Sequence, residues 1–303
     1  MELRHLRYFV TVAEELHFSR AAERLGIAQP PLSRQIQQLE AELGFLLFER
    51  SRPRVGLTAA GSVLLEHARR VFETIDTGVR DARRTSLGER GRVNVGYPSS
   101  LAYSGLTELL RAFRARFPDV DVGLKELPPA EQIEALKDGQ IDVGFIRGRV
   151  DDPELTFEIA RRETFVLALP LDHPLVKKKH IALANVALEP FVFFPRERGP
   201  AFFDQLISLC REAGFNPRIA HEAPPLDVLS LVGAGFGISI VPSSVRESGR
   251  SDVVLRPLIG APVSELFIAW RPSDLSPSCQ QFVELVRRIG VRRARRSLGA
   301  SRR

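Results

Sequence analysis

The sequence has few cysteines and no long apolar run. Cys210 and Cys279 are the two cysteines in 303 residues, and neither lies in a CxxC pair or a metal-ligand spacing. This usage is typical of reduced thiols and argues against a disulfide framework. No apolar run approaches the ~20 residues that a membrane span needs. The first residues, MELRHLRYFV, lack the uniform apolar core of a signal peptide. We therefore expect a cytoplasmic protein with no membrane partner.

The sequence also lacks the motifs that mark common enzyme classes. Its histidines show no HExxH or other zinc spacing, and there is no GxSxG motif, no P-loop and no GxGxxG opening a helix after a strand. GAGFG, at 233–237, lies between a predicted helix and a predicted strand, the reverse of the dinucleotide-binding order. We predict a protein that is not an enzyme, with no catalytic residues, cofactor or metal. A hydrolase using Cys210 or a serine is the alternative.

The composition is that of an ordinary globular protein, with positive charge gathered at one end. Its length predicts about two domains of roughly 150 residues each. The net charge is +6, but residues 287–303 contain eight arginines and no acidic residue. The basicity therefore describes the tail and does not by itself indicate a nucleic-acid partner. We expect 291–303 to be a disordered basic tail, with non-specific DNA binding as the alternative.

The stretch AQPPLSRQIQQLEAELG, residues 28–44, predicts a helix with two different faces. Spacings of four, three and four place its apolar residues on one buried face: Leu32, Ile36, Leu39 and Leu43. Proline is tolerated in a first helical turn, because the N–H that it lacks has no partner there. The other face carries amide, hydroxyl and guanidinium groups: Gln29, Ser33, Arg34, Gln37 and Gln38.

A shorter helix is predicted just before this one. We expect a first helix starting near Glu2 and a second in SRAAERLG, with Ser19 as its N-cap and Gly26 as its stop. Helix, tight turn and second helix form the helix-turn-helix arrangement, whose second helix enters the DNA major groove. FLLFERSRPRVGLT, after Gly44, predicts a small hairpin or wing.

From Thr58 the pattern is helical again. Its apolar residues approximate a heptad seam: Leu64, Ala68, Val71, Ile75, Val79 and Ala82. We interpret this segment as a dimerisation helix, because the preceding module is small; a helix packed on its own domain is the alternative. TSLGERG, residues 85–91, predicts a hinge by composition.

Beyond the hinge, predicted strands alternate with predicted helices. This indicates a mostly parallel α/β sheet, or two such sheets, which bind ligands at the carboxyl ends of their strands. Three strand ends deliver polar groups: YPSS at 97–100, Arg147 after DVGFI, and Pro195-Arg196 after FVFF.

In this order, the pieces resemble the LysR-type transcriptional regulators over essentially the full length. The motif runs from Leu3 to Gly61, and PDVDVGL, LKDGQIDVGF and LVGAGFGISIVP follow. The resemblance implies an N-terminal all-α, winged helix-turn-helix domain with a long linker helix. It further implies a C-terminal α/β effector domain of two subdomains, like a type 2 periplasmic binding protein. YPSS, FIRG and FFPRERGPAFF resemble most the subgroup that controls catabolism of benzoate, catechol and chlorinated aromatics, with muconate-like dicarboxylates as inducers.

The expected domain boundaries follow from these motifs. Residues 1–58 form the DNA-binding domain, 59–88 the linker helix and 89–290 the effector domain. The first effector subdomain takes about 91–161 and 268–290, and the second about 162–267.

The resemblance implies DNA contacts by four residues at the start of the second helix: Gln29, Pro30, Ser33 and Arg34. Arginine can bond guanine bidentately and glutamine can pair with adenine. Three wing arginines suit phosphate or minor-groove contact, with Thr58 as a phosphate donor: Arg50, Arg52 and Arg54. Ala28 stands where the family commonly has Ser or Thr as N-cap. A solvated helix face is the alternative for each residue.

The predicted ligand site is an anion pocket. Ser99 and Ser100 offer hydroxyl and N–H groups, and Arg147 can fork onto a carboxylate. The resemblance implies that Pro200 and Phe202 line the cleft. A surface salt bridge is the alternative for Arg147, and a turn or helix cap is the alternative for Ser99. Pro128 and Pro129 replace residues that often touch the effector in related regulators, so a ligand other than muconate stays open.

The resemblance also implies partners. We expect a homo-oligomer, a dimer through the linker helix and a tetramer of two dimers, on a double-stranded DNA operator with an inverted repeat, with RNA polymerase as a further partner. The expected function is to sense a small carboxylate and to activate catabolic genes. The alternatives are a repressor responding to a non-aromatic metabolite, a binding protein with a vestigial effector domain, and an enzyme of periplasmic-binding-protein fold.

Overall fold

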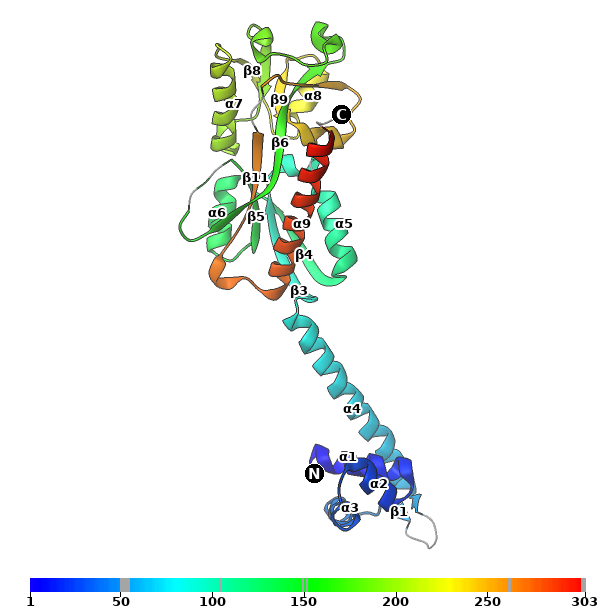
Figure 1. Ribbon diagram of the computed structural model, residues 1–303. Helices are drawn as coiled ribbons and strands as arrows, with labels where there is room; N and C mark the ends of the chain where they lie inside the picture. Colours follow the sequence, from blue (N-terminus) through cyan, green and yellow to red (C-terminus); the bar gives the residue numbers. More distant parts are fainter. Residues whose placement is uncertain (50–54, 104, 149, 151, 261–262, 301–303) are drawn as a thin grey trace. The chain divides into compact units, whose positions relative to one another are not determined.

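The computed structural model describes residues 1–49, 55–103, 105–148, 150, 152–260 and 263–300. The chain divides into two compact units, Met1–Arg83 and Arg84–Arg303 (Figure 1). Among the described residues, no helix is both long and apolar enough to cross a membrane.

The first unit is helical with a two-stranded wing. Its elements are α1 (Leu3–Glu15), α2 (Phe18–Leu25), α3 (Gln29–Leu43), β1 (Phe48–Glu49), β2 (Gly56–Leu57) and the start of α4 (Ala59–Ser86). The two strands pair antiparallel, as expected of the hairpin. The predicted helix, turn and helix are therefore present as α2 and α3.

The cap of α2 differs from the prediction. The N-cap is His17 and not Ser19, because the Nδ1 atom of His17 accepts hydrogen bonds from the amides of Ser19 and Arg20 at 3.2 and 3.4 Å. Gly26 does end the helix, in a left-handed conformation with φ of 66° that suits glycine.

The core of this unit ties α3 to the wing. Leu32, Ile36 and Leu39 are fully buried, as their spacing predicts. Glu40 is buried beside them, and its Oε1 atom accepts hydrogen bonds from the amides of Leu47 and Phe48 at 2.8 and 3.1 Å. Glu40 thereby fixes where the chain turns from α3 into β1.

The apolar stripe of α4 is divided between two environments. Ala68 is buried in the core of the first unit, and Leu64 packs against that core. Val71, Ile75 and Val79 are exposed. The start of the stripe therefore fits the alternative of a helix packed on its own domain, and its later part is not covered by any residue that the structure describes.

The second unit contains the remaining strands and helices. The strands are β3 (Arg90–Tyr97), β4 (Asp119–Glu126), β5 (Val143–Arg147), β6 (Thr156–Pro170), β7 (Pro190–Phe193), β8 (Arg218–Glu222), β9 (Ser239–Pro242), β10 (Val253–Pro257) and β11 (Val263–Trp270). The α-helices are α5 (Leu106–Arg116), α6 (Pro129–Lys137), α7 (Pro200–Glu212), α8 (Val228–Gly233) and α9 (Pro277–Ala300). Short 3₁₀ helices include η1 (Ser99–Tyr103), η4 (Arg196–Arg198) and η5 (Ser243–Ser248).

The sheets are mixed, which corrects the prediction of mostly parallel strands. The strand order is β10-β6-β11-β5-β3-β4 with β9 also on β6, and β7 pairs separately with β8. β3 is parallel to β4 and β5, whereas β11 runs antiparallel to both β5 and β6. No helix connects β5 to β6 or β10 to β11 among the described residues. Parallel crossovers need such a connection, so the alternation of strand and helix fails there.

Two separate cores show the two predicted subdomains. One surrounds Phe113, Phe145 and Phe282, and the other surrounds Phe165 and Phe191. Strand β6 contributes to both cores, because it pairs with β11 over its first part and with β10 over its last, whereas the buried residues Leu266, Ile268 and Trp270 of β11 belong to the first core. The expected subdomain boundaries fall inside these two long strands.

The carboxyl-terminal segment corrects another expectation. Helix α9 continues to Ala300, so the backbone of 291–300 is helical where we predicted disorder. The segment VRRARRSLGA contains no proline and is rich in good helix formers. Extending an existing helix also avoids the cost of a new nucleus.

Candidate functional site

The outer face of α3 presents the polar groups that the sequence predicts for DNA contact. Ala28 is the N-cap and makes no side-chain hydrogen bond, so this cap is as weak as expected. Gln29, Pro30 and Arg34 are exposed and Ser33 is half-buried. Gln29 donates a hydrogen bond from Nε2 to the Ser33 hydroxyl at 2.8 Å. Arg34 makes no hydrogen bond or ion pair with any described residue, so its guanidinium is available to a partner.

The wing supports the prediction less fully. Arg50, Arg52 and Arg54 lie outside the described residues. The hydroxyl of Thr58 donates to the Leu46 carbonyl at 2.8 Å and accepts from the Gly61 amide at 2.9 Å. Thr58 therefore caps α4, and its hydroxyl proton is already used within the protein, which departs from the predicted phosphate contact.

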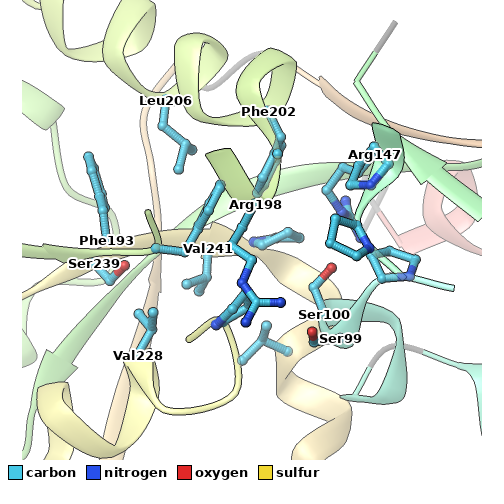
Figure 2. Close-up of a pocket in the computed structure, with 18 of the residues that line it drawn as sticks. Ser99, Ser100, Arg147, Phe193, Arg198, Phe202, Leu206, Val228, Ser239 and Val241 are labelled. Atoms are coloured by element: carbon cyan, nitrogen blue, oxygen red, sulfur yellow. The ribbon is translucent and has the colours of Figure 1, made fainter. Parts of the chain in front are cut away.

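The second unit holds a cavity of about 100 Å³ between its two subdomains. Its walls come from strand ends and from η1, η4, α7 and α8, and most of the side chains are apolar or proline. In Figure 2, Arg147, Ser99 and Ser100 gather at one end, and Phe193, Leu206, Val228 and Ser239 at the other. Phe202 and the guanidinium of Arg198 lie between them.

Arg147 is the buried cation of this cavity. Its side chain is 3% exposed at the end of β5, and its Nη1 atom donates to Glu163 Oε1 at 2.8 Å and to Ser264 Oγ at 3.0 Å. The guanidinium carbon lies 5.3 Å from the ring centre of Phe202. The Nε and Nη2 atoms are buried and have no hydrogen-bond partner. The alternative of an ordinary surface salt bridge is therefore wrong.

The unpartnered edge of Arg147 is the edge that clamps carboxylates elsewhere in this chain. Arg196 donates from Nε and Nη2 to the two carboxylate oxygens of Asp204 at 2.8 and 2.7 Å. Arg287 holds Glu158 through the same two atoms, both at 2.6 Å. Such bidentate pairs are among the strongest charge-assisted hydrogen bonds. A ligand carboxylate would satisfy Arg147 in the same way.

Glu163, on β6, holds Arg147 in place. Its Oε2 atom accepts a hydrogen bond from the backbone amide of Ser244 at 2.9 Å, so the carboxylate joins β5, β6 and η5. Burial acts to raise the pKa of Glu163, but the charges of Arg147 and Arg161 and the hydrogen bonds from Ser244 and Arg147 outweigh it and lower that pKa. Sequence reasoning missed Glu163, although an acidic residue directly before the apolar run TFVLALP was a visible signal.

Ser99 and Ser100 line the cavity as predicted, but the environment of Ser99 is unexpected. The Ser99 hydroxyl donates to the carboxylate of Glu126, a cavity-lining residue that sequence reasoning missed. Ser99 is also the first residue of η1, so the alternative of a simple turn residue describes its backbone. The wall near Ser99 therefore carries a negative charge as well as hydroxyls.

The two apolar residues predicted to line the cleft, Phe202 and Pro200, lie in different environments. Phe202 is 8% exposed, lines the cavity and stacks on Phe165 and Phe194. Pro200 is exposed in the first turn of α7 and does not line the cavity, which corrects the prediction. Its fixed φ angle suits helix initiation instead.

Further lining residues were absent from the prediction. Arg198 and Ser239 face the cavity, as do Pro128 and Pro129, which the sequence flags only as departures. Arg198 lies in FFPRERGPAFF and Ser239 in GISIVP, but neither pattern reveals which side chains turn inward. The folded positions of η4 and β9 determine that these two side chains line the cavity.

The sequence predicts no catalytic or metal-binding role for the two cysteines and the other metal-binding residue types. Cys210 and Cys279 are free and buried, and burial raises the pKa of Cys210 to about 12, so its thiol is not a reactive nucleophile at neutral pH. Within the described ranges, no group of three or more His, Cys, Asp or Glu side chains could hold a metal ion.

Similarity to known proteins covers both units of the chain. Residues 3–62 match the bacterial regulatory helix-turn-helix proteins of the lysR family, and residues 86–290 match the LysR substrate binding domain. The chain is 39% identical to the HTH-type transcriptional regulator AlsR of Bacillus subtilis (strain 168), over 94% of this chain and 95% of AlsR. It is 38% identical to the HTH-type transcriptional regulator CatR of Pseudomonas putida, over 94% of this chain and 98% of CatR.

Solved structures extend the similarity to the fold. A crystal structure of CbnR, a LysR family transcriptional regulator, matches with a TM-score of 0.87 at 36% identity, over 94% of this chain and all of that one. Full-length CbnR in complex with its target DNA matches with a TM-score of 0.83 at 36% identity, over 95% of this chain and 99% of that chain. The predicted fold class, a winged helix-turn-helix domain and a two-subdomain α/β effector domain, is confirmed, as is a regulatory and not enzymatic role. The chain belongs to the LysR family of DNA-binding transcriptional regulators.

Proposed function

We propose that this regulator binds a DNA operator through the outer face of α3 and senses a small carboxylate in the cavity of its second unit, in the cytoplasm. The observation that carries the ligand part is that Arg147 lines the cavity, and that its buried Nε and Nη2 atoms have no hydrogen-bond partner. A buried cation with unmade hydrogen bonds is costly to leave unsatisfied, and a carboxylate satisfies both atoms at once.

Titration of small mono- and dicarboxylates by isothermal titration calorimetry tests this proposal. Arg147→Lys keeps a positive charge but loses the planar fork, so we expect affinity to fall by about tenfold or more. Arg196→Lys is the matched control, because Arg196 makes a bidentate pair outside the cavity. Equal affinities for wild type and Arg147→Lys would remove Arg147 from the site.

The DNA part rests on the exposed groups of α3. Arg34 has no partner within the described chain, and the Gln29–Ser33 bond arranges an amide and a hydroxyl one helical turn apart. These donors match the edges of guanine and adenine in the major groove. The wing arginines, Arg50, Arg52 and Arg54, stay in the proposal as backbone contacts; Thr58 is secondary because its hydroxyl is engaged. We expect a selection from random oligonucleotides to yield an inverted repeat.

Assembly is proposed through α4. Val71, Ile75 and Val79 are 38, 38 and 65% exposed and follow the predicted seam. Burial of this stripe against a second copy would form a dimer, and two dimers would form the tetramer. Ile75→Asp would place a charge in that seam. We expect it to lower the oligomer mass in analytical ultracentrifugation, whereas Asp81→Asn, off the seam, should leave the mass unchanged.

Signal transfer is proposed through the subdomains. The cavity takes Arg147 from one subdomain and Phe202 and Ser239 from the other, so a ligand that contacts both favours one relative arrangement. The effect on DNA is limited by the ligand's difference in affinity for the two arrangements.

We propose that the regulator activates catabolic genes for aromatic compounds, acting with RNA polymerase. The motifs YPSS, FIRG and FFPRERGPAFF, which resemble the subgroup that controls catabolism of aromatic compounds, support this role. A footprint that changes on addition of the carboxylate is the expected readout.

A further inference from the structure

The cavity has a second polar position that lies away from Arg147. Ser239 is 1% exposed at the start of β9, where it pairs with Ala168 of β6, and it lines the cavity. It makes no side-chain hydrogen bond to any residue that the structure describes. Figure 2 places Ser239 at the end of the cavity that also holds Phe193, away from Arg147.

The surroundings of Ser239 make this hydroxyl unusual. Ile238 and Ile240 flank it in the chain and are buried, and the neighbouring lining residues Phe193 and Val228 are apolar. A buried hydroxyl without a hydrogen bond opposes folding, whereas alanine would fill the same place without that cost. A hydroxyl that both faces a cavity and lacks a partner is satisfied when a ligand supplies one.

The other polar groups of the cavity are less able to hydrogen-bond the end of a ligand that lies away from Arg147. The Glu126 carboxylate already accepts the Ser99 hydroxyl. Arg198 is exposed, and Figure 2 places its guanidinium between the two ends. Five of the lining residues are prolines without an N–H: Pro98, Pro128, Pro129, Pro225 and Pro242. Ser239 is therefore the buried hydrogen-bonding side chain of the end that faces away from Arg147.

We infer that the effector is a carboxylic acid with a hydroxyl or carbonyl group at the end distant from its carboxylate, and that Ser239 selects for this group. The inference rests on the proposed function, because Arg147 must hold the carboxylate for the distal group to reach Ser239. The middle of such a ligand is apolar, matching Phe202, Leu206 and Val241. The Ser239 hydroxyl can donate to a carbonyl or exchange a hydrogen bond with a hydroxyl.

Paired ligands test this selection on the full chain. Benzoate with 4-hydroxybenzoate, and hexanoate with 6-hydroxyhexanoate, differ only at the distal end, and calorimetry gives the affinity of each. We expect at least one hydroxylated acid to bind wild type about three- to tenfold more tightly than its parent, as one buried neutral hydrogen bond provides. Ser239→Ala should abolish this ratio, because it removes the hydroxyl that the distal group of the ligand would contact.

Ser244→Ala is the matched control. The Ser244 hydroxyl is also buried without a partner, but Ser244 does not line the cavity, and its bond to Glu163 comes from the backbone. This variant should keep the wild-type ratio. Ser239→Ala should also keep or raise the melting temperature, because it removes an unsatisfied hydroxyl, so a binding defect would not reflect misfolding.

The possible outcomes separate the two levels of proposal. If hydroxylated and parent acids bind wild type equally and Arg147→Lys weakens both, the carboxylate site stands and the role of Ser239 is wrong. If Ser239→Ala keeps the hydroxyl preference, Ser239 is likewise excluded. If none of the four acids binds wild type, both the carboxylate site and its distal group are overturned for this class of ligand.

Discussion

Arg34 and Arg147 are the central cations of the two proposed sites, and the protein holds them in opposite ways. Arg34 stands in water on α3 with no partner in the described chain, whereas Arg147 is 3% exposed and braced by Glu163 and Ser264. An exposed arginine keeps its hydration, so folding does not need to supply a counter-charge. A buried one must be paired, which makes the ligand site part of the folded core. The ligand site is therefore coupled to stability, and the DNA-contacting face is largely independent of it.

The strongest test of this contrast is Glu163→Gln. The substitution leaves the charge of Arg147 buried without compensation, so we expect the free energy of unfolding to fall by about 3–5 kcal/mol. Urea denaturation of the full chain measures this loss. Glu265→Gln, which breaks the exposed pair with Arg162, should change stability by about 0.5 kcal/mol or less. Similar losses for the two variants would erase the proposed distinction between buried and exposed pairs.

The pH dependence of Glu163→Gln sharpens the same test. The pKa of Glu163 is lowered in the folded state, so its contribution is fully present above the pKa of an unfolded glutamate, about 4.3. That contribution is lost as the pH falls through the lowered folded pKa. The stability gap between wild type and variant should therefore narrow on acidification, and a constant gap would contradict the assignment.

Arg34→Ala probes the other side of the comparison. We expect it to weaken binding to the selected operator by about 1–3 kcal/mol and to relax the base preference, with unchanged stability. Electrophoretic mobility shift with operator and scrambled DNA separates the two effects. Arg70→Ala, on the exposed face of α4, is the control for loss of charge alone. Unchanged operator affinity for Arg34→Ala would rule out a base contact by this residue.

The smallest expected effect is at the cap of α3. Ala28→Ser would supply the missing side-chain acceptor at the N-cap, and should raise the free energy of unfolding by about 1 kcal/mol. Thermal unfolding of the Ala28→Ser variant and of wild type measures this difference in stability. A fall in stability would mean that the two prolines already fix this turn in a geometry that excludes the serine bond.

The predictability of each site follows from how local its residues are. The buried and exposed faces of α3 were readable because helical periodicity fixes them within one segment. Arg147 was readable as a strand end, but its partners, Glu163 and Ser264, lie 16 and 117 residues away, so its burial could not be inferred. Pro200 was misplaced because the similarity suggested a cleft residue, while the turn of η4 into α7 leaves it exposed.

The direction of the strands was the other feature that could not be predicted from the sequence. Strand and helix alternation suggested parallel sheets, but β11 inserts between β5 and β6 and runs opposite to both. The position and direction of β11, the last strand in the chain, depend on contacts formed across the whole unit, which the sequence pattern does not reveal. By contrast, the error at the cap of α2 is local. His17 and Ser19 both carry a hydrogen-bond acceptor near the start of this helix, and His17 makes the capping bonds.

The most direct test is whether a small carboxylate acts on DNA binding through Arg147. An operator selected from random oligonucleotides would be footprinted with wild type, Arg147→Lys and Arg196→Lys, each with and without the tightest carboxylate from calorimetry. We expect all three to protect the operator without ligand, and the ligand to change the footprint of wild type and Arg196→Lys but not of Arg147→Lys at the same concentration. An identical ligand-induced change in Arg147→Lys, or no change in wild type at saturating ligand, would contradict the proposed sensing mechanism.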